Sequence, residues 1–193
     1  DFVFNGWGGQ DWASWDKDQH IGRIVAEAAG AERIASEMVN EGGGIQVDGT
    51  GRVIVTRTDQ LDPGRNPRPS QQDVEAELAR TIGVDSVLGL PRGVARDHET
   101  FGTRGHSDIL AAFATPEVLL MHRQDSQSHP DHVIARENRA VAERYFAEHG
   151  RAPEIIDLPV RPARTARVGS DEPVVRDEPA SPHRPGQRAP IPA

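Results

Sequence analysis

The chain has 193 residues, of which 36% are hydrophobic and 27% are charged, and its formal net charge is -8 at pH 7. This length suffices for one sizeable core or two small ones, and the acidic balance argues against a nucleic-acid-binding protein, which needs a basic face. Because the 193 residues include no cysteine, they can supply no disulfide, no thiolate zinc site and no thiol nucleophile.

Membrane and secretion signals are not apparent in the sequence. No run approaches the roughly 18 apolar residues of a membrane-spanning helix, and the N-terminus has no basic and apolar leader. We therefore expect a soluble, cytoplasmic protein that binds neither membrane nor nucleic acid. Since the chain begins at Asp1 rather than methionine, we also expect it to be part of a longer product.

Periodicity in the first half of the chain predicts alternating helices and strands. Glycine follows both helical patterns, at Gly30 and Gly83, and Ser70 with Asp73 forms a capping-box pattern before the second helix. The expected elements are a helix over 18–29, a strand near 34–39, a hairpin of 45–48 and 53–56, a helix over 70–82 and a strand over 86–90.

The same order of strand, strand, helix and strand then recurs. Its second copy comprises 109–114, 118–122, 131–148 and 154–158. Corresponding elements lie roughly sixty to seventy residues apart, which favours an α/β fold of repeated ββαβ modules. One such module cannot bury its sheet and helix faces alone, so neighbouring modules are expected to cover them. The helix over 18–29 and the strand near 34–39 would end an earlier copy.

The composition changes after residue 158. Eight of the 15 prolines lie from Pro159 onward, mixed with arginine and few apolar residues. Such a segment cannot offset the entropy of ordering its backbone. We expect a folded domain over 1–158 and a disordered, Pro/Arg-rich tail over 159–193.

Four motifs occur in a specific order across the proposed domain. They are Phe-Val-Phe-Asn-Gly-Trp-Gly-Gly at 2–9, Glu-Gly-Gly-Gly-Ile-Gln-Val-Asp-Gly-Thr-Gly at 41–51, Arg-Asn-Pro at 65–67, and Leu-Pro-Arg-Gly followed by Gly-His-Ser-Asp within 90–108. In this order they resemble the agmatine deiminase family, also called the bacterial-type peptidylarginine deiminase family. The resemblance implies a fivefold pseudo-symmetric α/β propeller, of which about two and a half modules are present here.

The resemblance also implies a reaction and a set of site residues. A cysteine thiolate attacks a guanidinium carbon, ammonia leaves, and water hydrolyses the intermediate, so that agmatine becomes N-carbamoylputrescine without metal or other cofactor. His106 matches the general acid/base and Asp108 a guanidinium-binding carboxylate; if 106–108 is extended, both face one side. Glu41, Asp97 and Trp7 are candidates for lining the substrate. The ordinary alternatives are that Glu41 is a solvated turn residue, Asp97 a solvated loop charge and Trp7 a core tryptophan.

Departures from the family pattern keep other interpretations open. The family's upstream aspartate and downstream nucleophilic cysteine lie outside this chain, so we expect it to be inactive alone. The substrate could be agmatine or peptidyl or free arginine, and the protein could be a non-catalytic guanidinium-binding remnant. A metal-dependent hydrolase is a further alternative, drawing on His98, His106, Asp108, His122, His129 and His132. Open sheet edges make the chain a candidate for self-association as a homo-oligomer.

Overall fold

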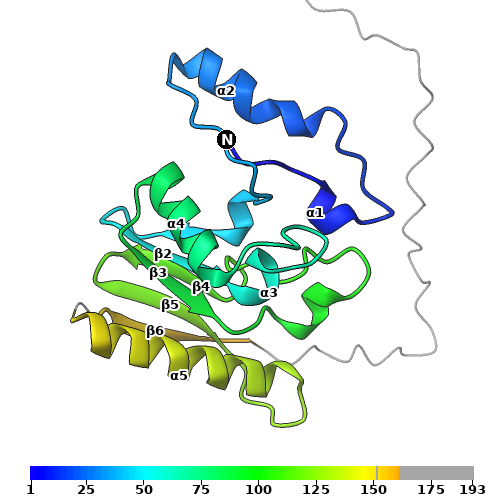
Figure 1. Ribbon diagram of the computed structural model, residues 1–193. Helices are drawn as coiled ribbons and strands as arrows, with labels where there is room; N and C mark the ends of the chain where they lie inside the picture. Colours follow the sequence, from blue (N-terminus) through cyan, green and yellow to red (C-terminus); the bar gives the residue numbers. More distant parts are fainter. Residues whose placement is uncertain (151, 161–193) are drawn as a thin grey trace, which may run out of the picture. The chain divides into compact units, whose positions relative to one another are not determined.

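The computed structural model describes residues 1–150 and 152–160, whose strands form two three-stranded sheets. The first sheet contains an antiparallel hairpin of β1 (Gln46–Val47) and β2 (Arg52–Thr56). Helix α4 (Gln71–Ile82) then crosses to β3 (Ser86–Leu90), which pairs with β2 in parallel (Figure 1).

The second sheet repeats this connectivity. Strands β4 (Ala111–Thr115) and β5 (Val118–Arg123) are antiparallel, and α5 (Asp131–His149) leads to β6 (Glu154–Pro159), parallel to β5. The repeated ββαβ order and the α/β class predicted from the sequence are therefore confirmed. The predicted tail begins at Pro159, which is the last residue of β6, and its residues from 161 onward lie outside the described part of the chain.

Capping residues set both ends of α4 and the C-terminal ends of the other two predicted helices. Ser70 and Asp73 form the capping box that begins α4: the Ser70 side chain accepts from the Asp73 amide, and the Asp73 carboxylate accepts from Ser70. Gly83 ends α4 with φ of 71°, a left-handed conformation that glycine adopts without steric cost. Glycines occupy the same cap position after α2 (Ile21–Ala29) and α5.

The strand predicted near 34–39 is wrong in extent. Only Val39 makes a ladder contact there, as an isolated parallel bridge to Val3. Residues 31–35 are exposed coil, and a strand needs a partner along its whole length to pair its backbone groups. Helix α2 is preceded by the short 3-10 turn Asp18–His20, so the helix predicted from residue 18 is confirmed apart from its first turn.

Two apolar clusters cover the two faces of the first sheet. Val53 and Val55 of β2 pack with Val74 and Leu78 of α4. Ile54 points to the other face and joins a cluster with β3, β5 and α5, whose buried members include Leu88, Leu90, Leu119, Ala142 and Phe146. The second module thus covers the face of the first sheet that α4 leaves open, as expected for repeats that cannot bury both faces alone.

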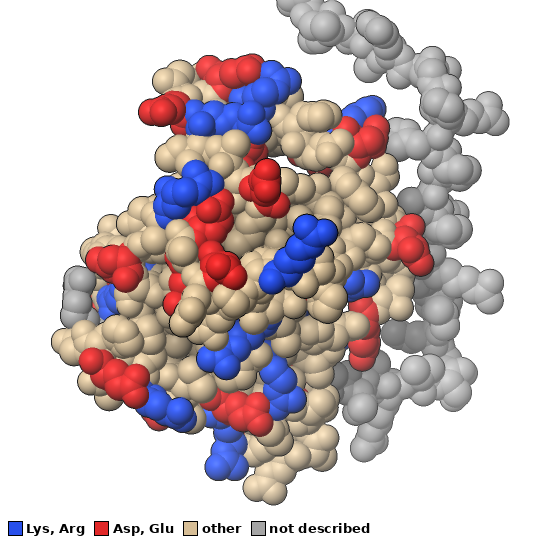
Figure 2. Space-filling view, in the orientation of Figure 1, with Lys and Arg blue, Asp and Glu red and all other residues tan. Residues whose placement is uncertain are grey.

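Charged side chains of both signs are interspersed on the face shown in Figure 2. In the described ranges, no helix combines the length and apolar character needed to cross a membrane.

Candidate active site

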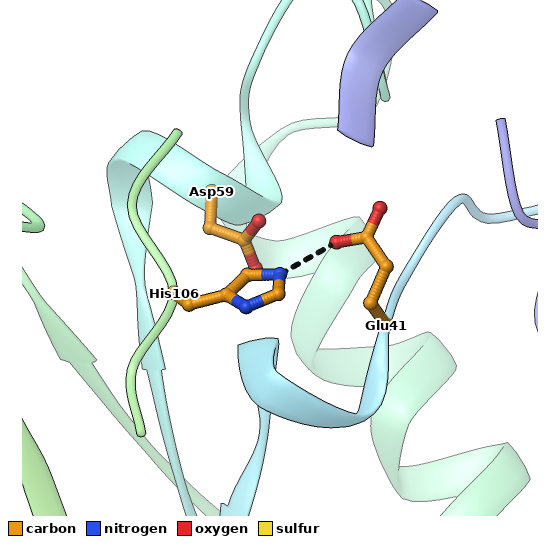
Figure 3. A group of neighbouring side chains, drawn as sticks. All are labelled: Glu41, Asp59 and His106. Carbon is orange, nitrogen blue, oxygen red and sulfur yellow. Dashed lines mark hydrogen bonds and ion pairs between the residues drawn. The ribbon is translucent and has the colours of Figure 1, made fainter. Parts of the chain in front are cut away.

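Three side chains from separate segments meet beside the first sheet (Figure 3). Glu41 directly precedes the 3-10 turn Gly42–Gly44, Asp59 lies in the short helix α3 (Arg57–Gln60), and His106 lies in the loop before β4. The Nε2 atom of His106 lies 3.0 Å from the Glu41 carboxylate. Both side chains are less than a tenth exposed, so this contact is shielded from solvent.

The segment carrying His106 and Asp108 is a turn, which corrects the extended conformation considered in the sequence analysis. The carbonyl oxygen of Gly43 accepts hydrogen bonds from the amides of Ser107 at 3.0 Å and Asp108 at 3.1 Å. A β-carbon at Gly43 would lie 2.3 Å from His106 Nδ1 and 2.8 Å from Asp108 Oδ2. The two side chains therefore converge on one glycine, although strand alternation is not the cause.

Asp97 shapes the loop that presents His106. It belongs to the 3-10 turn Ala95–His98, and its carboxylate accepts from the amides of Thr103 at 2.7 Å, Gly105 at 2.6 Å and His106 at 3.1 Å. The Thr103 hydroxyl also donates to it. These contacts lie within its own loop, and the substrate-lining role of Asp97 stays a prediction.

Arg65 joins the site through a buried network of charges. Its guanidinium contacts Glu41 at 2.9 Å and Asp59 at 3.2 Å, and the side chains of Arg65 and Asp59 are fully buried. Asn66 beside it bonds the amide and carbonyl of Val39. No motif in the sequence indicates a functional role for Asp59; the Thr56-x-x-Asp59 capping pattern, which the Thr56 side chain forms here, predicts only a helix start.

Burial and charge shift three pKa values at the site. Burial acts to raise the pKa of Glu41, but hydrogen bonds from His106 and Arg65 outweigh it and hold that pKa below its usual value. Burial acts to lower the pKa of His106, but the hydrogen bond to Glu41 and the negative charges of Asp59, Glu41 and Asp108 raise it. Burial raises the pKa of Asp59 to about 6, against the positive charge of Arg65.

Trp7 lies in a left-handed turn, labelled α1 (Gly6–Gly9), with φ of 55°. Its partly buried ring stacks on Trp12 at a centroid distance of 5.1 Å and meets Phe4 edge-on. The carbonyl of Gly8 accepts from Arg104, which joins this turn to the loop after Asp97. Trp7 is thus part of an aromatic cluster next to the loop that presents His106.

The structure does not assemble the histidines of the metal-hydrolase alternative. In the described part of the chain, only Glu41, Asp59 and His106 bring three acidic or histidine ligand atoms within 4.8 Å of one another. The Arg65 guanidinium already contacts both carboxylates. A divalent cation would have to share them with that buried positive charge, so the geometry does not favour a metal centre.

Comparisons with known proteins show which proteins this chain resembles. A family model described as Porphyromonas-type peptidyl-arginine deiminase matches residues 1–184. A Streptomyces coelicolor protein provisionally named agmatine deiminase is 45% identical over 159 residues, covering 82% of this chain and 47% of that protein. The agmatine deiminase of Stutzerimonas stutzeri is 34% identical over 164 residues, covering 83% and 44%.

A solved structure shows the same fold. The agmatine deiminase of Enterococcus faecalis superposes with a TM-score of 0.74 at 28% identity, covering 82% of this chain and 44% of that one. The chain therefore spans about half the length of the curated relatives that it matches.

Proposed function

Because the chain belongs to the Porphyromonas-type peptidyl-arginine deiminase family, we propose that it carries the acid/base and cation-binding part of a site that hydrolyses agmatine to N-carbamoylputrescine and ammonia. The supporting observation is that His106, bound to Glu41 at 3.0 Å, shares the neighbourhood of Gly43 with the Asp108 carboxylate. An imidazole beside a carboxylate can move protons next to a bound guanidinium.

Asp108 is the carboxylate we assign to the guanidinium. It is exposed, whereas Glu41 is nearly buried and already contacts Arg65 and His106. A guanidinium is planar and permanently charged, so a carboxylate can hold it through paired, charge-assisted hydrogen bonds. Asp97 then acts on the site indirectly, by fixing the backbone of the His106 loop.

His106 is the residue we assign to proton transfer. The negative charges around it favour the imidazolium near neutral pH, so it can donate a proton to departing ammonia. The resulting neutral imidazole can accept a proton from an attacking water in the following step. His106 thus acts as the imidazolium in the first step and as the neutral imidazole in the second. Its raised pKa supports the first of these roles.

The covalent step needs a cysteine, and these 193 residues contain none. We therefore assign to this chain alone the binding of a guanidinium without its hydrolysis. Its two ββαβ modules would belong to a fivefold α/β propeller, supported by the match to about half of an agmatine deiminase structure. The 1–158 domain boundary, the cytoplasmic location and self-association remain predictions.

Calorimetric titration of the chain with agmatine tests this proposal, with putrescine as the ligand control because it lacks the guanidinium. Agmatine should bind more tightly than putrescine. Asp108→Asn should weaken agmatine binding about tenfold, whereas Asp18→Asn, an exposed control in the turn before α2, should not. Equal binding of the two ligands would contradict the proposal.

Parallel titrations with arginine and an arginyl peptide would separate agmatine from the other substrates. An ammonia assay should detect no release by the chain alone. Release would show that a group other than cysteine supplies the nucleophile.

A further inference from the structure

We propose that Asp59 is a positioning residue for the acid/base group: by pairing with Arg65, it leaves the charge of Glu41 free to act on His106. The proposal deepens the assignment of His106 and rests on it for its relevance to catalysis.

Arg65 contacts Glu41 as well as Asp59, so its positive charge bears on the carboxylate that faces His106. Its Nε atom donates to Glu41 at 3.0 and 3.1 Å, and its terminal nitrogen contacts the same carboxylate at 2.9 Å. A fully buried guanidinium in this position would largely neutralise Glu41 if it had no other anionic partner. The imidazole would then face a neutral ion pair instead of a negative charge.

Asp59 is held in place to provide that partner. Its side chain is fully buried, 3.2 Å from Arg65 Nε. The Gln60 side chain donates to its carboxylate at 2.7 Å, and its amide donates to the Thr56 hydroxyl at 3.1 Å. These hydrogen bonds at the start of α3 fix the position of Asp59, and therefore the distance between its carboxylate and the Arg65 guanidinium.

The charges around His106 then sum to a negative environment. Glu41 faces it from the segment before Gly42–Gly44, Asp59 and Arg65 from α3 and the loop after it, and Asp108 from its own turn. The carboxylates of Glu41 and Asp59 and the guanidinium of Arg65 together carry one net negative charge. The exposed carboxylate of Asp108 adds a second. Asp59 acts in the same direction as Glu41 on the pKa of His106.

The test is an NMR titration of the His106 ring, assigned with a His106→Gln variant, in the free chain. Asp59→Asn should lower the pKa of His106 by about one, a tenfold loss of proton affinity. Asp62→Asn is the matched control, because Asp62 accepts from backbone amides of the same loop and, among the described residues, forms its ion pair with Arg104. It should leave the pKa of His106 unchanged.

A second variant separates charge from scaffolding. Arg65→Gln removes the cation and should raise the pKa of His106, and the double variant Asp59→Asn with Arg65→Gln should return it towards the original value. A folded Asp59→Asn protein with an unchanged pKa would overturn the proposal. If Asp59→Asn does not fold, an unchanged or lowered pKa in Arg65→Gln overturns it instead.

These readouts need no substrate. Failure of agmatine to bind would therefore reject the proposed function without altering the titration result.

Discussion

The His106 imidazole contacts the Glu41 carboxylate at 3.0 Å, although 65 positions separate the two residues in the sequence. The contact depends on a glycine, because Gly43 follows Glu41 closely and supplies the carbonyl that binds the backbone after His106. The carboxylates of Glu41, Asp59 and Asp108 all raise the pKa of this imidazole, so replacing one of them should change that pKa.

Replacing Glu41 by glutamine should lower the pKa of His106 by about 1 to 2, because burial is then opposed by the charges of Asp59 and Asp108 without that of Glu41. The amide retains a similar shape, so the fold should persist. An NMR titration measures the change. Glu37→Gln, at an exposed position four residues earlier, is the control and should have no effect.

Replacing Gly43 by alanine should disturb His106 and Asp108 together. The new methyl group would lie 2.3 Å and 2.8 Å from their polar atoms, closer than van der Waals contact allows. We expect agmatine affinity to fall about tenfold or more in calorimetry. Gly42→Ala is a matched control, since a β-carbon there meets nothing within 4 Å. Equal losses in both variants would contradict the role given to Gly43.

Asp59 should make stability depend on pH. Its folded pKa of about 6 lies above its ordinary value of 3.8, so the folded state binds more protons between these values. Its contribution is most favourable below about pH 4 and is lost as pH rises through 6. Relative to Asp59→Asn, the original chain should lose about 3 kcal/mol of unfolding free energy over this range.

Urea unfolding at several pH values measures this difference. Parallel stability curves for the original chain and Asp59→Asn would show that the buried carboxylate does not titrate in this range.

Replacing Phe146 by alanine should lower the unfolding free energy by about 3 to 5 kcal/mol, because this side chain is 2% exposed in the cluster that joins the two modules. Val133→Ala, on the same helix but 52% exposed, should change it by less than about 0.5 kcal/mol. Urea unfolding of both variants provides the comparison. Similar losses would mean that the inter-module cluster contributes little.

The sequence by itself determined the repeated module. Apolar spacing and capping residues are local signals, so Ser70, Asp73 and Gly83 were sufficient to place both ends of α4. The strand near 34–39 was predicted wrongly because a strand is defined by its partner, and only Val39 has one. The order of motifs also identified Glu41, His106 and Asp108 as candidates before their distances were known.

Only the tertiary structure decided what surrounds these residues. Asp59 has no motif of its own, and the part played by Arg65 depends on two carboxylates from separate segments. Only the structure shows that the Asp97 carboxylate accepts hydrogen bonds from backbone amides of its own loop. The physical reason is that helix starts and ends depend on neighbouring residues, whereas the pKa of a buried group depends on charges that folding brings together from distant parts of the chain.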